Sequence, residues 1–149
     1  MRSKRTITVY AILALLLFVF VPLARAADPV SQVLVNYADI LKANPMPAGE
    51  KAQAIKVAGD DTATLFVARF APGADVKAHF HKSHTETLYV IEGKIEMMID
   101  GKALEFKPGA IIFIPMNKVH AAKITSSSDL VALQVLTPAL KEADRVSAP

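Results

Sequence analysis

Residues 73–93 read GADVKAHFHKSHTETLYVIEG, and this stretch indicates both the fold and the chemistry of the chain. His79 and His81 are two positions apart in a segment of strand-like composition, so both imidazoles point to the same face of a strand. Glu86 begins the next apolar segment, and a hairpin between the two segments returns its carboxylate to that face. Two imidazoles and a carboxylate on one face can bind a divalent transition metal.

A fourth candidate ligand, His120, follows an apolar strand and the turn Pro115-Met116-Asn117. From there its imidazole can complete the metal site from the opposite side of a barrel. The alternative for all four side chains is a set of polar residues at strand ends that hold no ion. His84 lies in the loop between the ligands, where a solvated histidine is the plainer interpretation and proton transfer or substrate contact the alternative.

Short apolar segments separated by turn signals extend outward from this stretch. Asp100-Gly101 is a two-residue turn between alternating segments and is typical of a type I′ hairpin. Such segments, at a spacing of about ten residues and without long helical periodicity, predict an all-β antiparallel sandwich or barrel. The predicted strands are 53–58, 62–70, 76–81, 87–91, 94–99, 102–106, 110–114, 121–125 and 130–136.

The two ends of this region are less regular. Residues 27–42 fit either a helix capped by Asp28-Pro29 or a short strand over 33–35 with a helical turn after Tyr37. The connector 44–49 contains two prolines and a glycine, so it cannot continue a regular element. Residues 141–149 are polar, and we expect them to be frayed.

Residues 1–26 have the pattern of a secretory signal peptide. Arg2, Lys4 and Arg5 precede an apolar run over 7–23, and Ala24-Arg25-Ala26 supplies a small-x-small cleavage pattern. We therefore expect cleavage after Ala26 and a periplasmic or secreted protein that has no membrane contact after cleavage. An uncleaved membrane anchor is the alternative, although the run of apolar residues is at the short limit for spanning a bilayer.

Composition excludes several functional classes. The chain of 149 residues has no cysteine, which excludes a disulfide scaffold, a thiol nucleophile and a cysteine-ligated metal site. The formal net charge of +3 depends on the first 26 residues, and without them 13 basic and 14 acidic side chains remain. A nucleic-acid partner is not expected, because no basic stripe remains to neutralise phosphates. We expect a small-molecule ligand or substrate instead.

The glycine, histidine and glutamate spacing resembles the two motifs of the cupin superfamily. Gly73, His79-Phe80-His81, Glu86 and Gly93 match the first motif in full, and Gly109, Pro115 and His120 match most of the second. Two positions depart from the second motif. Asn117 replaces a glycine, and asparagine tolerates the left-handed conformation of that turn. Ile124 replaces an asparagine that is not a metal ligand in the family.

The resemblance implies a fold and a division of the chain. Similarity to small exported single-domain cupins implies a double-stranded β-helix, or jelly roll. The expected division is a signal peptide (1–26), an N-terminal segment with the first strands (27–61), the cupin barrel (62–138) and a C-terminal tail (139–149).

The resemblance also implies a site and a class of function. It implies one divalent metal ion per chain (Fe, Mn, Ni or Zn) bound by His79, His81, Glu86 and His120. The implied function is a metal-dependent dioxygenase, isomerase or decarboxylase-like enzyme with Glu86 as a proton acceptor. A non-catalytic binding or sensory module and a purely structural ion are the alternatives. A homodimer is expected, because small jelly rolls leave sheet edges unpaired.

Overall fold

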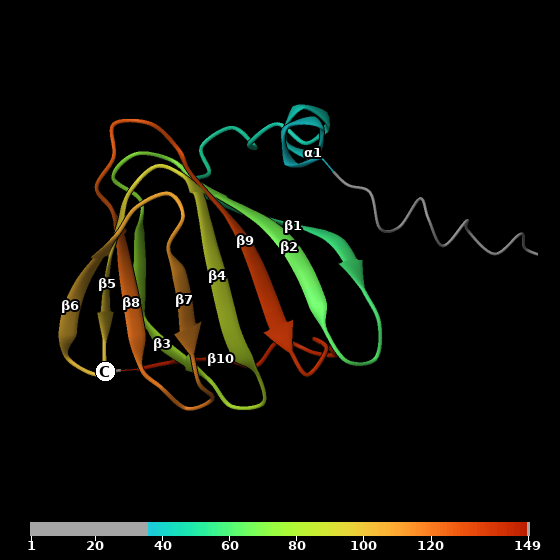
Figure 1. Cartoon of the computed structure of the whole chain (residues 1–149), viewed down its shortest axis with the longest axis vertical. Helices are drawn as coiled ribbons and strands as arrows, with labels where there is room; N and C mark the ends of the chain where they lie inside the picture. Colours follow the sequence, from blue (N-terminus) through green and yellow to red (C-terminus); the bar gives the residue numbers. More distant parts are fainter. Residues whose placement is uncertain (1–35, 149) are drawn as a thin grey trace, which may run out of the picture.

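The computed structural model describes residues 36–148, which form two five-stranded antiparallel sheets and one short helix (Figure 1). One sheet has the strand order β1-β2-β9-β4-β7, and the other has the order β10-β3-β8-β5-β6. The all-β jelly-roll prediction is confirmed. The strands are β1 (Ala52–Gly59), β2 (Thr64–Phe70), β3 (Asp75–His81), β4 (Thr85–Glu92), β5 (Ile95–Ile99), β6 (Lys102–Phe106), β7 (Ile111–Ile114), β8 (His120–Ile124), β9 (Leu130–Thr137) and β10 (Arg145–Ser147).

The nine predicted strands are all present, because alternating apolar residues set which face of each strand is buried. On β5, Ile95 and Met97 are buried, whereas Glu96 and Met98 are exposed. The turn between β5 and β6 has positive φ at Asp100 (47°) and Gly101 (77°), as a type I′ hairpin requires.

The hydrophobic core lies between the two facing sheets seen in Figure 1. Each sheet contributes one apolar face to this core, and burial of these faces stabilises the packing of the two sheets. The most deeply buried large side chains of this core include Val90, Met97, Ile114 and Leu130.

The helix α1 (Tyr37–Ala43) lies outside the two sheets (Figure 1). Its N-cap is Asn36, whose side chain accepts a hydrogen bond from the Ala38 N–H at 2.9 Å. Of the two alternatives for residues 27–42, the helical turn after Tyr37 is present, whereas one continuous helix from a cap at Asp28-Pro29 is wrong because α1 begins at Tyr37. The strand expected at 33–35 and the signal peptide at 1–26 lie outside the described residues. Within residues 36–148, no helix has the length and apolar composition needed to cross a membrane.

The C-terminal residues correct one prediction. Residues 145–147, expected to be part of a frayed tail, form β10 and pair with β3. The backbone of this segment finds hydrogen-bond partners on the free edge of β3, which offsets the lack of apolar side chains in the tail.

Candidate metal centre

Three strands bring the four predicted ligands together. His79 and His81 lie on β3, and the pairing of β3 with β8 places His79 opposite His120. Glu86 comes from β4, which belongs to the other sheet. The expected hairpin between the two segments is therefore wrong, and the Glu86 carboxylate meets the histidines from the facing sheet. The turn before β8 contains Asn117, whose φ of 64° is the left-handed conformation expected there and whose N–H donates to the His81 carbonyl at 2.8 Å. The site therefore joins both sheets.

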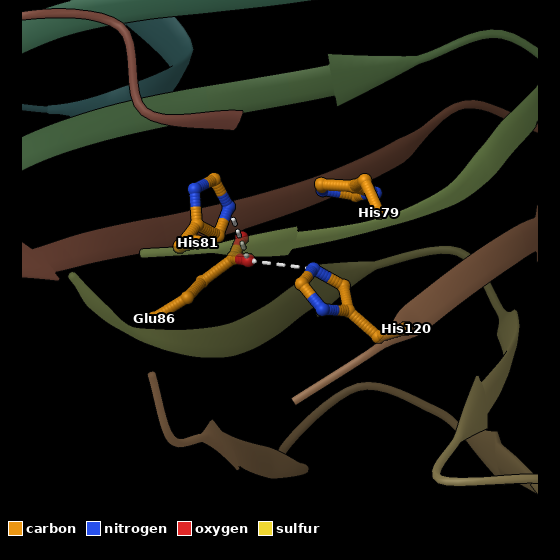
Figure 2. Close-up of side chains that lie close together, drawn as sticks. All are labelled: His79, His81, Glu86 and His120. Atoms are coloured by element: carbon orange, nitrogen blue, oxygen red, sulfur yellow. Dashed lines mark ion pairs between the residues drawn. The ribbon is translucent and has the colours of Figure 1, made fainter. Parts of the chain in front are cut away.

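The four side chains converge on one point. One ligand atom from each of them lies within 4.8 Å of the ligand atoms of the other three. Glu86 Oε2 lies 3.2 Å from His120 Nε2 and 3.5 Å from His81 Nε2, and Figure 2 shows the carboxylate between these two rings. His79, Glu86 and His120 are buried, with 6%, 5% and 3% of their surfaces exposed.

Each histidine uses its Nδ1 atom for a hydrogen bond that leaves Nε2 available. Nδ1 of His79 lies 2.9 Å from the Lys77 carbonyl, and Nδ1 of His120 lies 2.9 Å from the Lys118 carbonyl. Nδ1 of His81 lies 2.8 Å from a carboxylate oxygen. Since these oxygens only accept, each Nδ1 carries the proton and each neutral ring keeps a lone pair on Nε2. This is the arrangement that histidine ligands have around a metal ion.

One buried atom of the cluster, His120 Nε2, lacks a hydrogen-bond partner in the described part of the chain. Among residues 36–148, the two buried side-chain atoms without a partner are Arg69 Nε and His120 Nε2. Leaving such an atom unsatisfied costs about 1 to 3 kcal/mol, and a cation coordinated by His120 Nε2 would remove that cost. Three imidazole nitrogens and one carboxylate oxygen also suit a divalent transition metal. The residues present therefore fit a metal ion.

Glu86 carries the negative charge of the cluster. Gln134 on β9 donates from Nε2 to Glu86 Oε1 at 2.6 Å, which leaves Oε2 directed at the histidines. Burial alone would raise the pKa of the Glu86 carboxyl, but the imidazoles of His120 and His81 and the Gln134 amide hold the pKa below its usual range. Glu86 is therefore ionised at neutral pH, as a metal ligand must be.

Two of the histidines differ in their electrostatic environment. Burial lowers the pKa of His79 to about 4, because it outweighs the hydrogen bond to the Lys77 carbonyl. The Glu86 carboxylate raises the pKa of His81 against the opposing effect of burial, and Asp144 adds to that increase. His79 is consequently neutral at physiological pH. The carboxylates of Glu86 and Asp144 instead favour the protonated form of the His81 imidazole in the metal-free cluster.

The cluster opens into a cavity of about 530 Å³ between the sheets. Apart from the four converging side chains, Gln53 and Gln134, the inner wall is mainly apolar and includes Phe70, Val76, Leu88, Ile95, Met97 and Leu130. Lys77 and Arg145 also line the cavity, and both are exposed, so they mark its rim. A small, largely apolar molecule with one polar end would fit this space.

The solvated interpretation of His84 is wrong, since the residue is only 3% exposed. Its Nδ1 donates to Asp144 Oδ2, and its Nε2 lies 3.4 Å from the Ala139 carbonyl. The same aspartate accepts from His81 Nδ1 through Oδ1. His84 is thus fixed next to the cluster but is not one of its four converging side chains.

Besides Gln134, which orients Glu86 from β9, Asp144 and Arg145 are site residues that the sequence did not reveal. Both lie in the polar tail, 63 or more positions after His81 in the chain. The available signal was one apolar residue, Val146, flanked by polar residues, and this is too short to indicate a strand. Only the pairing of β10 with β3 brings these residues to the site.

Comparison with known sequences agrees with this architecture. Residues 66–136 match a family described as the cupin domain. Over 70 residues the chain is 36% identical to a quercetin 2,3-dioxygenase from Bacillus subtilis, which covers 47% of this chain and 20% of that enzyme. Over 63 residues it is 30% identical to an L-ectoine synthase from Saccharophagus degradans, which covers 41% of this chain and 47% of that enzyme. The chain thus spans less than half the length of these two relatives.

Solved structures show the same fold. An uncharacterised double-stranded β-helix protein from Klebsiella pneumoniae has a TM-score of 0.67 to this chain at 18% sequence identity. The match covers 83% of this chain and 97% of that protein. The matched family segment contains all four converging side chains. Residues 66–136 therefore form a cupin domain.

Proposed function

We propose that this protein is an exported metal-dependent enzyme that acts on a small anionic or enolisable organic molecule. The metal is one divalent transition ion, Fe, Mn, Ni or Zn, held by His79, His81, Glu86 and His120. The observation that carries the proposal is the convergence of three imidazoles and one carboxylate at the wall of a largely apolar cavity. When bound, the ion supplies Lewis-acid or redox chemistry.

The charges around the cavity support an anionic substrate. Three neutral imidazoles and one carboxylate around a divalent ion leave a local charge of about +1, which favours an anionic ligand. On the rim, Lys77 is paired with Asp75 at 2.5 Å. Arg145 donates to the Lys77 carbonyl at 3.3 Å and has no carboxylate partner among residues 36–148. Its guanidinium can therefore bind and orient a carboxylate or enolate.

The relatives support an enzyme over a passive binding protein. Two of them are named for reactions, a quercetin 2,3-dioxygenase and an L-ectoine synthase. In this chain, Gln134 orients the Glu86 carboxylate, the apolar wall excludes water, and Glu86 is the proton acceptor nearest the converging nitrogens. Dioxygenase, isomerase or decarboxylase-like chemistry would use these same parts.

Metal analysis tests the first part of the proposal. Wild-type protein purified from the exported fraction should contain about one divalent ion per chain by elemental analysis. His120→Ala should lose most of that metal, because the remaining three ligands cannot complete the site. Lys123→Ala, an exposed change on the same strand, is the matched control and should keep full occupancy. Equal occupancy in all three proteins would contradict the proposal.

A substrate screen tests the second part. Metal-loaded and metal-free protein are offered hydroxy acids, keto acids, catechols and uronates, and oxygen uptake and product mass are followed. Turnover of an acid but not of its neutral amide or ester, only in the metal-loaded protein, is the expected result. Turnover that is indifferent to metal removal would contradict the mechanism. Tight metal-dependent binding without turnover would instead establish a binding or sensory module.

Export has its own test. The segment 1–26 has a charged start, an apolar run and a small-x-small end, which supports removal after Ala26 and a periplasmic or secreted location. Intact-mass analysis of the protein from the exported fraction should give the mass of residues 27–149. A mass that still includes the apolar residues 7–23 would indicate a membrane-anchored protein.

A further inference from the structure

The C-terminal segment passes directly alongside the candidate metal centre. The Leu140 N–H donates to Thr64 Oγ1 at 2.9 Å, and the chain then turns into β10. In the pairing of β10 with β3, Arg145 lies opposite His81 and Ser147 lies opposite His79. The segment is therefore an edge strand laid against the two histidines that β3 contributes.

Asp144 is the residue of this segment with the most contacts to the site. Its side chain is 8% exposed, although it lies at the edge of the barrel. Oδ1 accepts from His81 Nδ1 at 2.8 Å. Oδ2 accepts from the Ser83 N–H at 3.0 Å, from Ser83 Oγ at 2.9 Å and from His84 Nδ1. Both carboxylate oxygens are thus fully used, and the ring of His81 is tied to the loop that precedes β4.

The three converging histidines differ in how their rings are held. His79 and His120 donate to carbonyl oxygens two positions earlier in their own chain segments, Lys77 and Lys118. These two contacts are local, since each joins residues two positions apart in the chain. His81 instead depends on a residue 63 positions away. Of the three converging histidines, His81 alone has its Nδ1 atom hydrogen-bonded to the C-terminal segment.

We propose that Asp144 is a positioning residue of the metal centre, delivered to His81 by the strand β10. Its carboxylate holds His81 in the tautomer that carries the proton on Nδ1, so that Nε2 faces Glu86 with a free lone pair. An ionised acceptor also makes the imidazole a stronger electron donor than a carbonyl acceptor would. This inference rests on the proposed metal binding, and it assigns to the tail a role beyond covering the barrel.

The experiment measures Zn²⁺ affinity by competition with a chromophoric chelator. Asp144→Ala should weaken affinity about 10- to 100-fold, the usual effect of removing a carboxylate behind a histidine ligand. Asp144→Asn should fall between it and wild type, because the amide keeps one oxygen that can accept from His81. Glu142→Gln removes an exposed charge from the same segment and should leave affinity unchanged.

A second measurement separates positioning from a general loss of structure. In metal-free protein at alkaline pH, ¹⁵N NMR of the imidazoles should show His81 protonated on Nδ1 in wild type. In Asp144→Ala the proton should shift toward Nε2 at His81, and in Asp144→Asn, whose side chain can present either its oxygen or its NH2 group to the ring, it should shift in part, while His79 and His120 keep their tautomers. Simple unfolding would change all three rings together.

The outcomes distinguish this inference from the proposed function. Wild-type protein that binds no Zn²⁺ would overturn the proposed function. Wild-type protein that binds Zn²⁺, combined with an Asp144→Asn affinity within twofold of the Glu142→Gln control and an unchanged His81 tautomer, would overturn the role of Asp144 alone. Because Asp144→Asn keeps the size and one acceptor oxygen of the side chain, it decides the question even if Asp144→Ala does not fold.

Discussion

At the scale of one residue, the contacts of Glu86 fix the direction of both its carboxylate oxygens. Its Oε1 accepts from Gln134, and its Oε2 lies near His120 and His81. Glu86→Gln keeps the shape and an oxygen donor, but it removes the negative charge and the proton acceptor. We expect partial metal binding and a loss of turnover of about 100-fold or more, within the range for a lost general base.

The control for this variant is Glu96→Gln, the same substitution at an exposed position on β5. It should leave both metal content and turnover unchanged. Elemental analysis and the assay identified in the substrate screen provide the two readouts. Full activity of Glu86→Gln would remove Glu86 from the chemistry and leave it no more than a structural role.

His79 gives a pH prediction at the same scale. Its pKa is about 4 in the folded protein and near 6.5 when exposed, so the unfolded chain binds the extra proton between these values. The free energy of unfolding therefore falls as pH decreases from about 6.5 to 4. In metal-free protein this loss should be about 3 kcal/mol larger in wild type than in His79→Gln, which lacks the titrating group.

Urea unfolding of both proteins at pH 7 and pH 4, with a chelator present, measures the difference. Comparing each protein with itself at the two pH values cancels any pH-independent cost of the substitution. Parallel losses in the two proteins would show that His79 does not titrate abnormally.

At the scale of elements, the turn before β3 and the turn after β4 each contain a glycine with a positive φ, Gly73 and Gly93. Gly93, between β4 and β5, has a φ of +80°, and an added Cβ would lie 2.6 Å from the Asp129 carbonyl oxygen and 2.8 Å from the Leu130 Cα. Gly73, before β3, has a similar φ of +70° but no atom within 4 Å of that position. Substituting alanine at Gly73 therefore measures the cost of backbone strain alone, and substituting alanine at Gly93 measures that cost together with a steric conflict.

Gly73→Ala should cost about 1 kcal/mol from the left-handed conformation alone. Gly93→Ala should cost about 3 kcal/mol, because backbone atoms of the β8–β9 turn must also move. Thermal or denaturant unfolding of the two variants gives the comparison. Equal destabilisation would mean that the β8–β9 turn shifts without cost.

The same elements show what sequence patterns can and cannot predict. The strands around Asp100-Gly101 were predictable because alternation and turn chemistry are local properties. The four converging side chains were predictable because they lie on β3, β4 and β8 at the fixed spacings of the two cupin motifs. β10 was not, because its three residues are held by pairing with β3. His84 was misjudged for the same reason, since Asp144 buries it from a distant part of the chain.

At the scale of the whole molecule, metal binding should be visible as stability. A ligand present at 100 times its Kd stabilises the folded state by about 2.7 kcal/mol, which corresponds to a rise in Tm of about 10 °C for a domain of this size. Metal-free wild-type protein should show this rise when Zn²⁺ or Mn²⁺ is added, and His120→Ala should not. A rise of the same size in His120→Ala would place the ion elsewhere.

Self-association also belongs to this scale and stays a prediction. The strand β7 lies at the edge of its sheet, where Ile111 and Phe113 are 71% and 65% exposed. An apolar edge strand of this kind favours pairing with a second copy of the chain. Light scattering at micromolar concentration should give the mass of a dimer, and a monomeric mass would contradict the prediction.

The origin of the four converging side chains in both sheets has a mechanical consequence. The three histidines come from one sheet and Glu86 from the other, so an ion bound to all four would tie the sheets together like a covalent crosslink. The chain has no cysteine, so no disulfide within it can supply such a tie. For this barrel, removing the ion with a chelator would correspond to reducing a disulfide. The stability of the packing between the two sheets would then depend on the supply of metal instead of on the redox state.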